Sequence, residues 1–366
     1  MTFSNIFRKS FTKIIILLGC WMVLLSSCRS QTPALPSAPE ASNTPMLLES
    51  PTPTMQFTQK PSATPTLPPL GNDGNPITIG FMLSSEERNP LEAAEDIAFM
   101  IATDTGFAVE SLIYPDFQSF STAILNGDVD LFWLDPFEYI YLNWEGASQV
   151  LLVTNHLGVY AYGVRFMAHT ERGFTSYYNS DTNQSVGDPI QALQQFAGTR
   201  PCFLRPNSIP GYYVPLGLLT KASTPVREPV FTYTYSGIVR ALYVQGICDF
   251  GVGYALKGDP RTAGNIIQDL PDIKDQVKII WQTEGIIPNL NLSAAPDLSL
   301  HLRQRLQESF LDLSSKEEGL TLLSTALNYD VEALKIVTDQ FYNPLRDAII
   351  PLEPDLLNMI LSAINP

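Results

Sequence analysis

The stretch STAILNGDVDLFWL, residues 121–134, joins a helical segment to a strand and decides the fold. Ser121 can cap a helix, and the apolar residues that follow it have helical spacing. Gly127 is suited to end that helix, and Asp130 stands at the start of the apolar run behind it. A helix that leads into a buried strand is the building unit of α/β folds, so we predict this class.

A second stretch, SGIVRALYVQGICDFG at residues 236–251, repeats this order. Ser236 can cap a helix, Gly246 can end it, and Asp249 begins the next strand. Asp130 and Asp249 lie 119 positions apart. The repetition indicates two similar α/β lobes, although the usual alternation of helices and strands in such folds also produces this order without a repeat.

The flanking sequence continues the alternation of strand and helix. ITIGFM, residues 77–82, predicts a buried strand, and a helix follows with Asn89 as its cap and Pro90 in its first position. Gly106 ends this helix, and residues 107–114 predict a second strand. This alternation favours parallel strands connected by helices. After Trp281 the pattern becomes helical and fits a chain that returns to brace its first lobe, with helical spacing over residues 300–313, 317–327, 331–340 and 356–364.

The N-terminus has the three parts of an export signal. Three basic residues precede an apolar run, residues 14–25, which is too short to span a bilayer of ~30 Å as a helix. Leu25-Ser26-Ser27-Cys28 then resembles the lipobox of bacterial lipoproteins. We therefore expect residues 1–27 to be a signal peptide, and a lipid on Cys28 to anchor the chain to a bacterial membrane on its extracytoplasmic side. The alternative is a short membrane anchor that stays uncut.

Residues 28–76 read as a lipidated cysteine followed by a disordered tether. They hold 11 of the 29 prolines, with many Ser and Thr between them. Such a composition cannot bury enough apolar surface to fold, so the segment stays extended and lifts the globular part off the membrane. A disordered interaction tail is the alternative.

Composition excludes several classes of function. The formal net charge is −15 and no basic cluster offsets it, so we exclude nucleic acid as a partner. The three histidines have no metal-ligand spacing, and no P-loop, nucleophile elbow, HExxH or CxxC motif is present. We expect no metal, no cofactor and no enzymatic activity. Cys202 and Cys248 either form a disulfide, as exported proteins allow, or remain two buried thiols.

Most of the folded chain, from about residue 77 to residue 344, resembles the phosphate, phosphite and phosphonate solute-binding proteins of ABC importers. Four segments carry the resemblance in the same order as in the family. They are residues 125–139, similar to G-x-V-D-hydrophobic-x-W-x-G-P-x-x-Y; residues 188–198, similar to the L-x-x-L-x-G-K helix; residues 207–215, similar to the ligand loop P-x-S-T-S-G-Y-x-x-P; and residues 285–288, similar to the returning crossover.

The resemblance implies a bilobed, Venus-flytrap fold of the type 2 periplasmic binding proteins, with the ligand in the cleft between the lobes. We expect residues 77–160 to begin lobe 1, residues 161–284 to form lobe 2, and residues 285–366 to return to lobe 1 and end in helices. The family's activity implies that a monomer captures a small anionic solute by lobe closure and delivers it to an ABC permease in the membrane.

Three departures from the family pattern concern the ligand loops. The family's Ser-Thr-Ser falls on Ser208-Ile209-Pro210, which removes two hydroxyls and one backbone N–H. Tyr233–Ser236 stand where a His is common, and Asp135 stands where Gly is usual. The site is therefore poorer in hydrogen-bond donors and richer in tyrosine than a phosphonate site of this family.

We predict the ligand-binding residues from segments that follow strands or open helices. Ser208 and the N–H groups near Gly211 would hold an acceptor group, and the tyrosines would supply hydroxyls and apolar walls. Asp135 would accept from a donor on the ligand or repel a full anion, which favours an anionic solute that also carries a donor, such as a zwitterion. The predicted set is Trp133, Asp135, Phe137, Tyr139, Asn207, Ser208, Gly211, Tyr212, Tyr235, Ser236 and Tyr254.

Other readings of the same residues stay open at this point. A sensory lipoprotein of the same fold could signal to a membrane kinase, and the ligand could be an organic acid without phosphorus. An extracellular enzyme of similar architecture lacks a convincing nucleophile, base or metal set. Arg165 and Arg240 could face a ligand, although ion pairs are the more common role of such residues.

Overall fold

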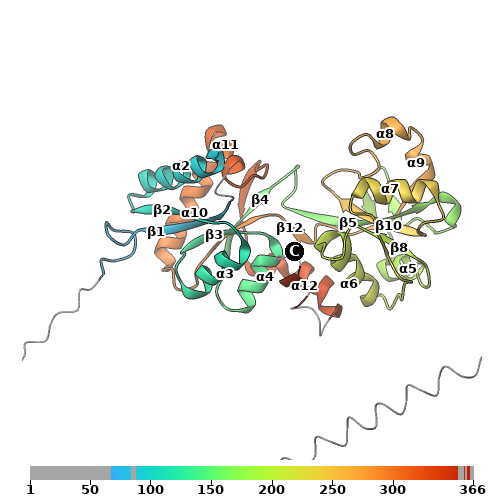
Figure 1. The fold of residues 1–366 in the computed structure, drawn as a ribbon, viewed down its shortest axis with the longest axis horizontal. Helices are drawn as coiled ribbons and strands as arrows, with labels where there is room; N and C mark the ends of the chain where they lie inside the picture. Colours follow the sequence, from blue (N-terminus) through green and yellow to red (C-terminus); the bar gives the residue numbers. More distant parts are fainter. Residues whose placement is uncertain (1–66, 84–87, 353–357, 359–360, 363–366) are drawn as a thin grey trace, which may run out of the picture. The chain divides into compact units, whose positions relative to one another are not determined.

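The computed structural model describes residues 67–83, 88–352, 358, 361 and 362 (Figure 1). The predicted signal peptide, the lipidation site Cys28 and most of the predicted tether lie outside these residues, as does most of the helix expected over residues 356–364. Residues 67–76, which the sequence assigns to the tether, form a turn against the first strand. Gly71 N–H donates to the Asn75 carbonyl, and Ala108 N–H donates to the Gly71 carbonyl, both at 2.8 Å. No helix in the described part is long and apolar enough to cross a bilayer.

The first sheet has the strand order β14-β4-β13-β3-β1-β2. Strand β1 pairs in parallel with β2 and β3, whereas β13 and β14 run antiparallel to their neighbours. The sheet is thus mixed, whereas the sequence predicted parallel strands. Strand β13 returns from the second lobe and β14 follows a helix of lobe 1, and both run antiparallel to their neighbours. Its strands are β1 Ile77–Met82, β2 Val109–Tyr114, β3 Leu131–Leu134, β4 Gln149–Asn155, β13 Asn291–Ala294 and β14 Ala333–Ile336.

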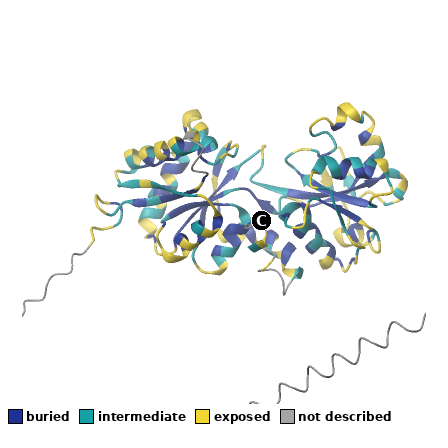
Figure 2. Cartoon of the chain, viewed as in Figure 1, coloured by how far each residue is buried: buried dark blue, intermediate teal, exposed yellow. Residues whose placement is uncertain are grey.

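Helices cover the faces of this first sheet, and Figure 2 shows its strands buried beneath them. Helices α2, α10 and α11 pack on one another, and the predicted helices at 300–313 and 317–327 are confirmed. The predicted helix at 331–340 is wrong. Its residues form strand β14, held by pairing with β4, and the short 3-10 helix η3, Asp339–Tyr342. The helices are α2 Arg88–Thr105, α3 Phe117–Asn126, α4 Pro136–Trp144, α10 Leu300–Ser314 and α11 Glu317–Ala326.

The second sheet has the order β11-β5-β10-β8-β9, with β12 also pairing with β5. Here β10 and β8 are parallel, and β5 runs antiparallel to both β10 and β11. Its strands are β5 Ala161–His169, β8 Pro201–Phe203, β9 Val230–Phe231, β10 Phe250–Ala255, β11 Val277–Gln282 and β12 Ile287–Pro288, beside a small hairpin of β6 Tyr178–Asn179 and β7 Gln184–Ser185. Its helical elements are η1 Thr170–Arg172, α5 Pro189–Gln194, η2 Ile209–Tyr213, α6 Val214–Lys221, α7 Tyr235–Val244, α8 Ile266–Asp269 and α9 Ile273–Gln276.

The two repeated sequence stretches occupy equivalent places in the two sheets. Asp130 precedes β3 and accepts the backbone N–H and the hydroxyl of Thr78 in β1, at 2.8 and 2.9 Å. Asp249 precedes β10 and accepts the N–H of Arg200, next to β8, at 2.7 Å. Each aspartate therefore ties the start of one strand to its parallel neighbour.

The helix caps of the two repeats differ from the prediction. Helix α3 is capped by Asp116 and α7 by Thr234, whose side chains accept backbone N–H groups of the first turn. Ser121 and Ser236 lie inside these helices, because each helix starts earlier than the apolar pattern indicates.

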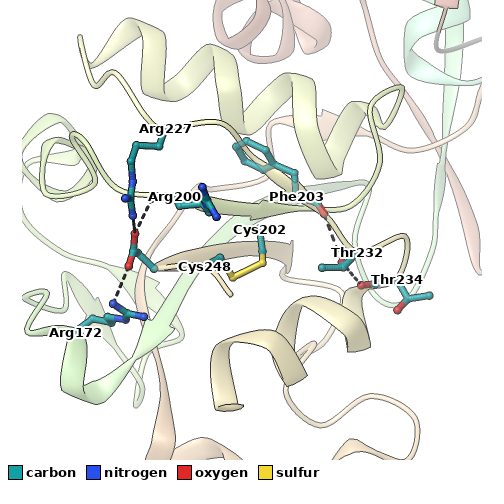
Figure 3. Close-up of a disulfide and its surroundings, with 9 residues drawn as sticks. Arg172, Arg200, Cys202, Phe203, Arg227, Thr232, Thr234 and Cys248 are labelled. Atoms are coloured by element: carbon teal, nitrogen blue, oxygen red, sulfur yellow. Dashed lines mark hydrogen bonds and ion pairs between the residues drawn. A yellow bond between two sulfur atoms is a disulfide. The ribbon is translucent and has the colours of Figure 1, made fainter. Parts of the chain in front are cut away.

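Cys202 and Cys248 form a disulfide, with Cα atoms 5.6 Å apart (Figure 3). The bond joins β8 to the segment that leads into β10. Asp249, next to the disulfide, forms ion pairs with Arg172 at 2.8 Å and with Arg227 at 2.9 Å. The alternative that the sequence left open is thus decided for pairing.

Two chain segments that cross between the lobes are hydrogen-bonded to each other. Asn289 N–H donates to the Tyr160 carbonyl at 3.0 Å. The Asn289 side-chain amide donates to the carbonyl of Val159 at 2.6 Å and to that of Thr154 at 3.3 Å. The residues near 156–160 and 287–290 therefore run side by side as a paired crossing.

A third crossing comes from the end of the chain. The Tyr139 ring of α4 lies 4.1 Å from that of Tyr342, and its hydroxyl donates to Asp339 at 2.8 Å. Helix α12, Asn343–Ile349, then packs on α6 of the second lobe, followed by η4, Ile350–Leu352. The helical end of the chain was expected to brace lobe 1. Helices α10 and α11 do so, but α12 lies on lobe 2.

Candidate functional site

A cavity of about 260 Å³ is lined by residues from both lobes. On the lobe 1 side its wall comes from the start of α4, the turn between α11 and β14, and the second crossing. On the lobe 2 side it comes from the start of β5, the start of η2 and the turn after β10. Ligands of open α/β folds bind beyond such strand ends. The lining residues are Asp135, Pro136, Tyr162, Ile209, Pro210, Lys257, Pro288, Asn289, Leu290 and Tyr329.

The start of α4 is closed by a capping box. The Asp135 carboxylate accepts the N–H groups of Phe137 at 2.8 Å and of Glu138 at 3.1 Å, and the Glu138 carboxylate accepts the N–H of Asp135 at 2.8 Å. Pro136 has no N–H to offer. The chain itself therefore satisfies the first-turn donors that could otherwise hold an anion.

The two carboxyl groups of this capping box share one buried environment. Burial raises the pKa of Asp135, although the N–H groups of Glu138 and Phe137 oppose the shift. Burial and the charge of Asp135 raise the pKa of Glu138 well above its usual range. Glu138, only 4% exposed, is thus the member of the pair that holds a proton more readily.

The start of η2 is capped in a similar way. The Ser208 hydroxyl oxygen accepts the N–H of Gly211 at 3.1 Å, and Pro210 carries no N–H. A Cβ atom at Gly211 would lie 2.4 Å from Cβ of Leu204. The close approach that requires glycine here is therefore to Leu204, and the helix start again uses its own cap.

Lys257 is the one cation among the described residues that line the cavity. Its ammonium lies 3.7 Å from the centre of the Tyr162 ring, and no acidic side chain of the described chain forms an ion pair with it. Burial lowers the pKa of Lys257. Burial, followed by the nearby Tyr235 and Asp135, raises the pKa of Tyr162 well above its usual range.

Asn289 presents a second unsatisfied group at the cavity wall. The residue is 2% exposed, and its amide nitrogen is fully used by the two crossing carbonyls. Its side-chain oxygen is buried and has no hydrogen-bond partner among the described residues. A buried acceptor without a partner is costly, so this position favours a donor from a water or a solute.

The predicted lobe 1 residues divide between cavity and core. Asp135 lines the cavity. Trp133 packs edge-on against Phe310 in the core, Phe137 is 1% exposed, and Tyr139 is fully buried with its hydroxyl on Asp339. Strand β3 and helix α4 turn these three side chains into the core of lobe 1, so they do not line this cavity, and their part in ligand binding stays a prediction.

The predicted lobe 2 residues lie near the cavity without lining it. Tyr235 packs edge-on against Tyr254 at 5.2 Å, and its phenol lies close enough to Tyr162 to affect that group's pKa. Tyr212 joins an aromatic cluster with Phe203 and Phe231 instead. The remaining predicted positions are Asn207, half-buried in the turn before Ser208, and Ser236, whose hydroxyl donates to Thr234.

Four lining residues escaped the sequence analysis: Tyr162, Lys257, Asn289 and Tyr329. Lys257 follows β10 by two positions, so the rule that sites lie beyond strand ends points to it. Tyr162 stands at the start of an antiparallel strand, which meets the same edge of the sheet. Arg165 and Arg240, the cations that the sequence singled out, form ion pairs with Asp259 and Asp269.

A family described as the periplasmic substrate-binding proteins of phosphonate ABC transporters matches residues 79–342. The chain belongs to this family. Among curated relatives of this phosphonate-transporter family, the phosphate-import protein PhnD of Mycolicibacterium smegmatis is 24% identical over 292 residues, covering 75% of this chain and 85% of that protein.

Solved structures give the same fold. XAC2383 of Xanthomonas citri, bound to chloride, has a TM-score of 0.51 at 16% identity and covers 77% of this chain and 98% of its own. The same protein bound to ATP also scores 0.51, at 15% identity. PhnD1 of Prochlorococcus marinus in complex with methylphosphonate has a TM-score of 0.45 at 14% identity, covering 75% of this chain and 97% of its own.

Membership defines the general role of the chain. It is an extracytoplasmic substrate-binding component of a phosphonate-family ABC transporter, with the bilobed type 2 fold, and it is a binding protein and not an enzyme. In the described residues no group of His, Cys, Asp and Glu side chains could hold a metal ion.

Proposed function

We propose that this protein captures a small anionic, phosphonate-like solute in the cavity between its lobes and delivers it to the membrane permease of its importer. A lipid on Cys28 and the Pro-rich segment after it would hold the binding domain near that permease. The observation that carries the proposal is the cavity itself, whose wall combines the starts of α4 and η2 with Lys257.

Residues from both lobes supply this wall, which couples occupancy to lobe closure. A solute that contacts both lobes binds the closed arrangement better than the open one, and this difference in affinity shifts the population toward closure. The division into lobe 1, residues 77–160 and 285–366, and lobe 2, residues 161–284, remains part of the proposal. The separate strand orders of the two sheets support it.

Calorimetry with the full chain, purified in detergent, tests this function. The panel is methylphosphonate, inorganic phosphate, phosphite, a short alkanesulfonate and a dicarboxylic acid. We expect saturable binding of methylphosphonate at one site per chain, with weaker binding of the dicarboxylic acid. Binding of the dicarboxylic acid alone, or of no member of the panel by the folded protein, would contradict the proposal.

A further inference from the structure

Among the described residues, the cavity wall carries one positive charge, Lys257, and no acidic side chain forms an ion pair with it. We propose that the Lys257 ammonium is the charged anchor of the solute's anionic group, so that the site recognises its ligand through a side-chain cation where helix N–H groups are already occupied. This inference rests on the proposed function and names the residue that determines its specificity for anions.

The chain itself caps the helix starts at the cavity. Those of α4 and η2 both border the cavity, and an uncapped helix N-terminus would attract an anion. Here Asp135 accepts two N–H groups of α4, Ser208 accepts one of η2, and a proline occupies the first turn of each. The backbone therefore offers the solute little positive potential at these places.

An aromatic ring and an unusual turn hold Lys257 in place. Its ammonium lies on the Tyr162 ring face, well within the distance of a favourable cation–π contact. The turn that presents it is unusual, because Leu256 has φ of 73° and Gly258 has φ of 128°. A leucine in the left-handed region costs conformational free energy, and such residues persist where the surrounding structure requires a particular turn.

In the described part of the chain, one acidic side chain lines the cavity together with Lys257. Asp135 lines the same cavity, but its carboxylate is engaged with α4, and the structure records no ion pair between the two groups. A half-buried ammonium has lost part of its hydration, and an opposite charge beside it offsets that loss. A phosphonate, phosphate or sulfonate group at Lys257 would provide that charge through a charge-assisted hydrogen bond.

A matched pair of lysine variants tests the inference. Lys335 also stacks on aromatic rings, 5.3 Å from the Tyr160 ring and 5.6 Å from the Phe341 ring, but it is exposed on β14 and does not line the cavity. In calorimetry with methylphosphonate, Lys257→Met should weaken binding by about tenfold or more, because a hydrogen bond between charged groups is lost. Lys335→Met should bind like the wild type, and both variants should melt close to it.

Chemical labelling gives a second readout that requires no variant. Acetic anhydride, followed by peptide mass spectrometry, measures how readily each lysine of the full chain reacts. Saturating methylphosphonate should protect Lys257 several-fold and leave Lys335 unchanged. Equal labelling of Lys257 with and without the ligand would overturn the inference.

The two readouts separate this inference from the proposed function. If the wild type binds methylphosphonate and Lys257→Met binds it within threefold, the anchor is wrong and the function stands. If the folded wild type binds none of the tested anions, the function and the anchor are both wrong.

Discussion

Asp135 does two things with one carboxylate: it caps α4 and it lines the cavity. Capping holds the group at a fixed place, and its charge opposes an anion that approaches Lys257. The neighbouring Glu138 holds a proton more readily, which limits the negative charge that the pair presents. If Lys257 anchors an anion as proposed, the affinity of the cavity for anions would be set by the balance between Lys257 and this pair.

Substitution of Asp135 separates its two roles. Asp135→Asn keeps a good cap and removes the charge, so affinity for methylphosphonate should rise several-fold with little change in melting temperature. Asp135→Gly also frees the N–H groups of Phe137 and Glu138, at a small cost in stability. Calorimetry and thermal melting measure both effects, and weaker anion binding by the Asn variant would contradict this account.

Asp249 makes part of the stability dependent on pH. Burial alone would raise the pKa of Asp249, but the Arg200 N–H and the guanidinium groups of Arg227 and Arg172 lower it overall. Because the folded pKa lies below the unfolded one, the stabilisation is full above the unfolded pKa, about 3.9, and disappears as pH falls through the folded pKa. In thermal melts below about pH 4, the wild type should lose more stability than Asp249→Asn. Melting temperatures of the two proteins that fall in parallel as the pH is lowered would refute this.

At the scale of elements, the disulfide and Asp249 both act where β8 and β10 begin. The cavity lies beyond the opposite, carboxyl ends of strands such as β3 and β10. Fastening the starts of these parallel strands leaves their far ends to present the turn of Lys257. Stability and ligand contact are thus supplied at different ends of the same sheet.

Removal of the disulfide should therefore affect stability more than binding. The double variant Cys202→Ser/Cys248→Ser should lose about 2–4 kcal/mol of unfolding free energy, because a loop of 46 residues is no longer closed in the unfolded chain. Urea unfolding measures this, with reduced wild type as the control. An unchanged urea midpoint, or a large loss of methylphosphonate affinity at constant fold, would count against it.

The apolar spacing within a segment was enough to predict several helices and strands. Ile77–Met82 forms the strand that its apolar run predicts, and α10 and α11 follow their helical spacing. Ala333–Ile336 has helical spacing too, yet pairs with β4, because an open strand edge in the distant first half of the chain captures it. The secondary-structure propensity of residues 333–336 does not reveal this long-range pairing.

The residues of the candidate site are even harder to predict from local sequence. Asp135 was identified because a helix start after a strand is a local signal. Tyr162, Asn289 and Tyr329 meet at the cavity only because the crossings bring three distant segments together. Trp133, Phe137 and Tyr139 lie in the core and do not line this cavity, and sequence alone does not show which way a side chain faces at a strand end.

At the scale of the whole molecule, the proposed anchor determines where binding takes place. A solute-binding domain held by a lipid and a tether of about forty residues would stay within reach of its permease, which would raise its effective concentration there. The domain need not diffuse freely to deliver its solute. The proposed lipid would thus affect the rate of delivery and not the affinity of the cavity.

The anchor is tested by Cys28→Ala. The variant should take up no lipid label and should persist as the unprocessed precursor, because the acceptor thiol is absent. Metabolic labelling with a radioactive fatty acid, together with the mobility of the protein on a gel, measures both. Normal cleavage and labelling of the variant would mean that the lipobox interpretation is wrong.

Helix α12 fits against α6 so closely that a Cβ atom at Gly217 would lie 1.9 Å from the Ala348 carbonyl oxygen. The packing of the second lobe is therefore completed by helix α12, which follows lobe 1 in the sequence. During export the chain leaves the cytoplasm from its N-terminus, so α6 emerges long before the helix that covers it. Until the last segment arrives, the lobe exposes an apolar groove to proteases and chaperones, and a product cut short by a premature stop would stay in that vulnerable state.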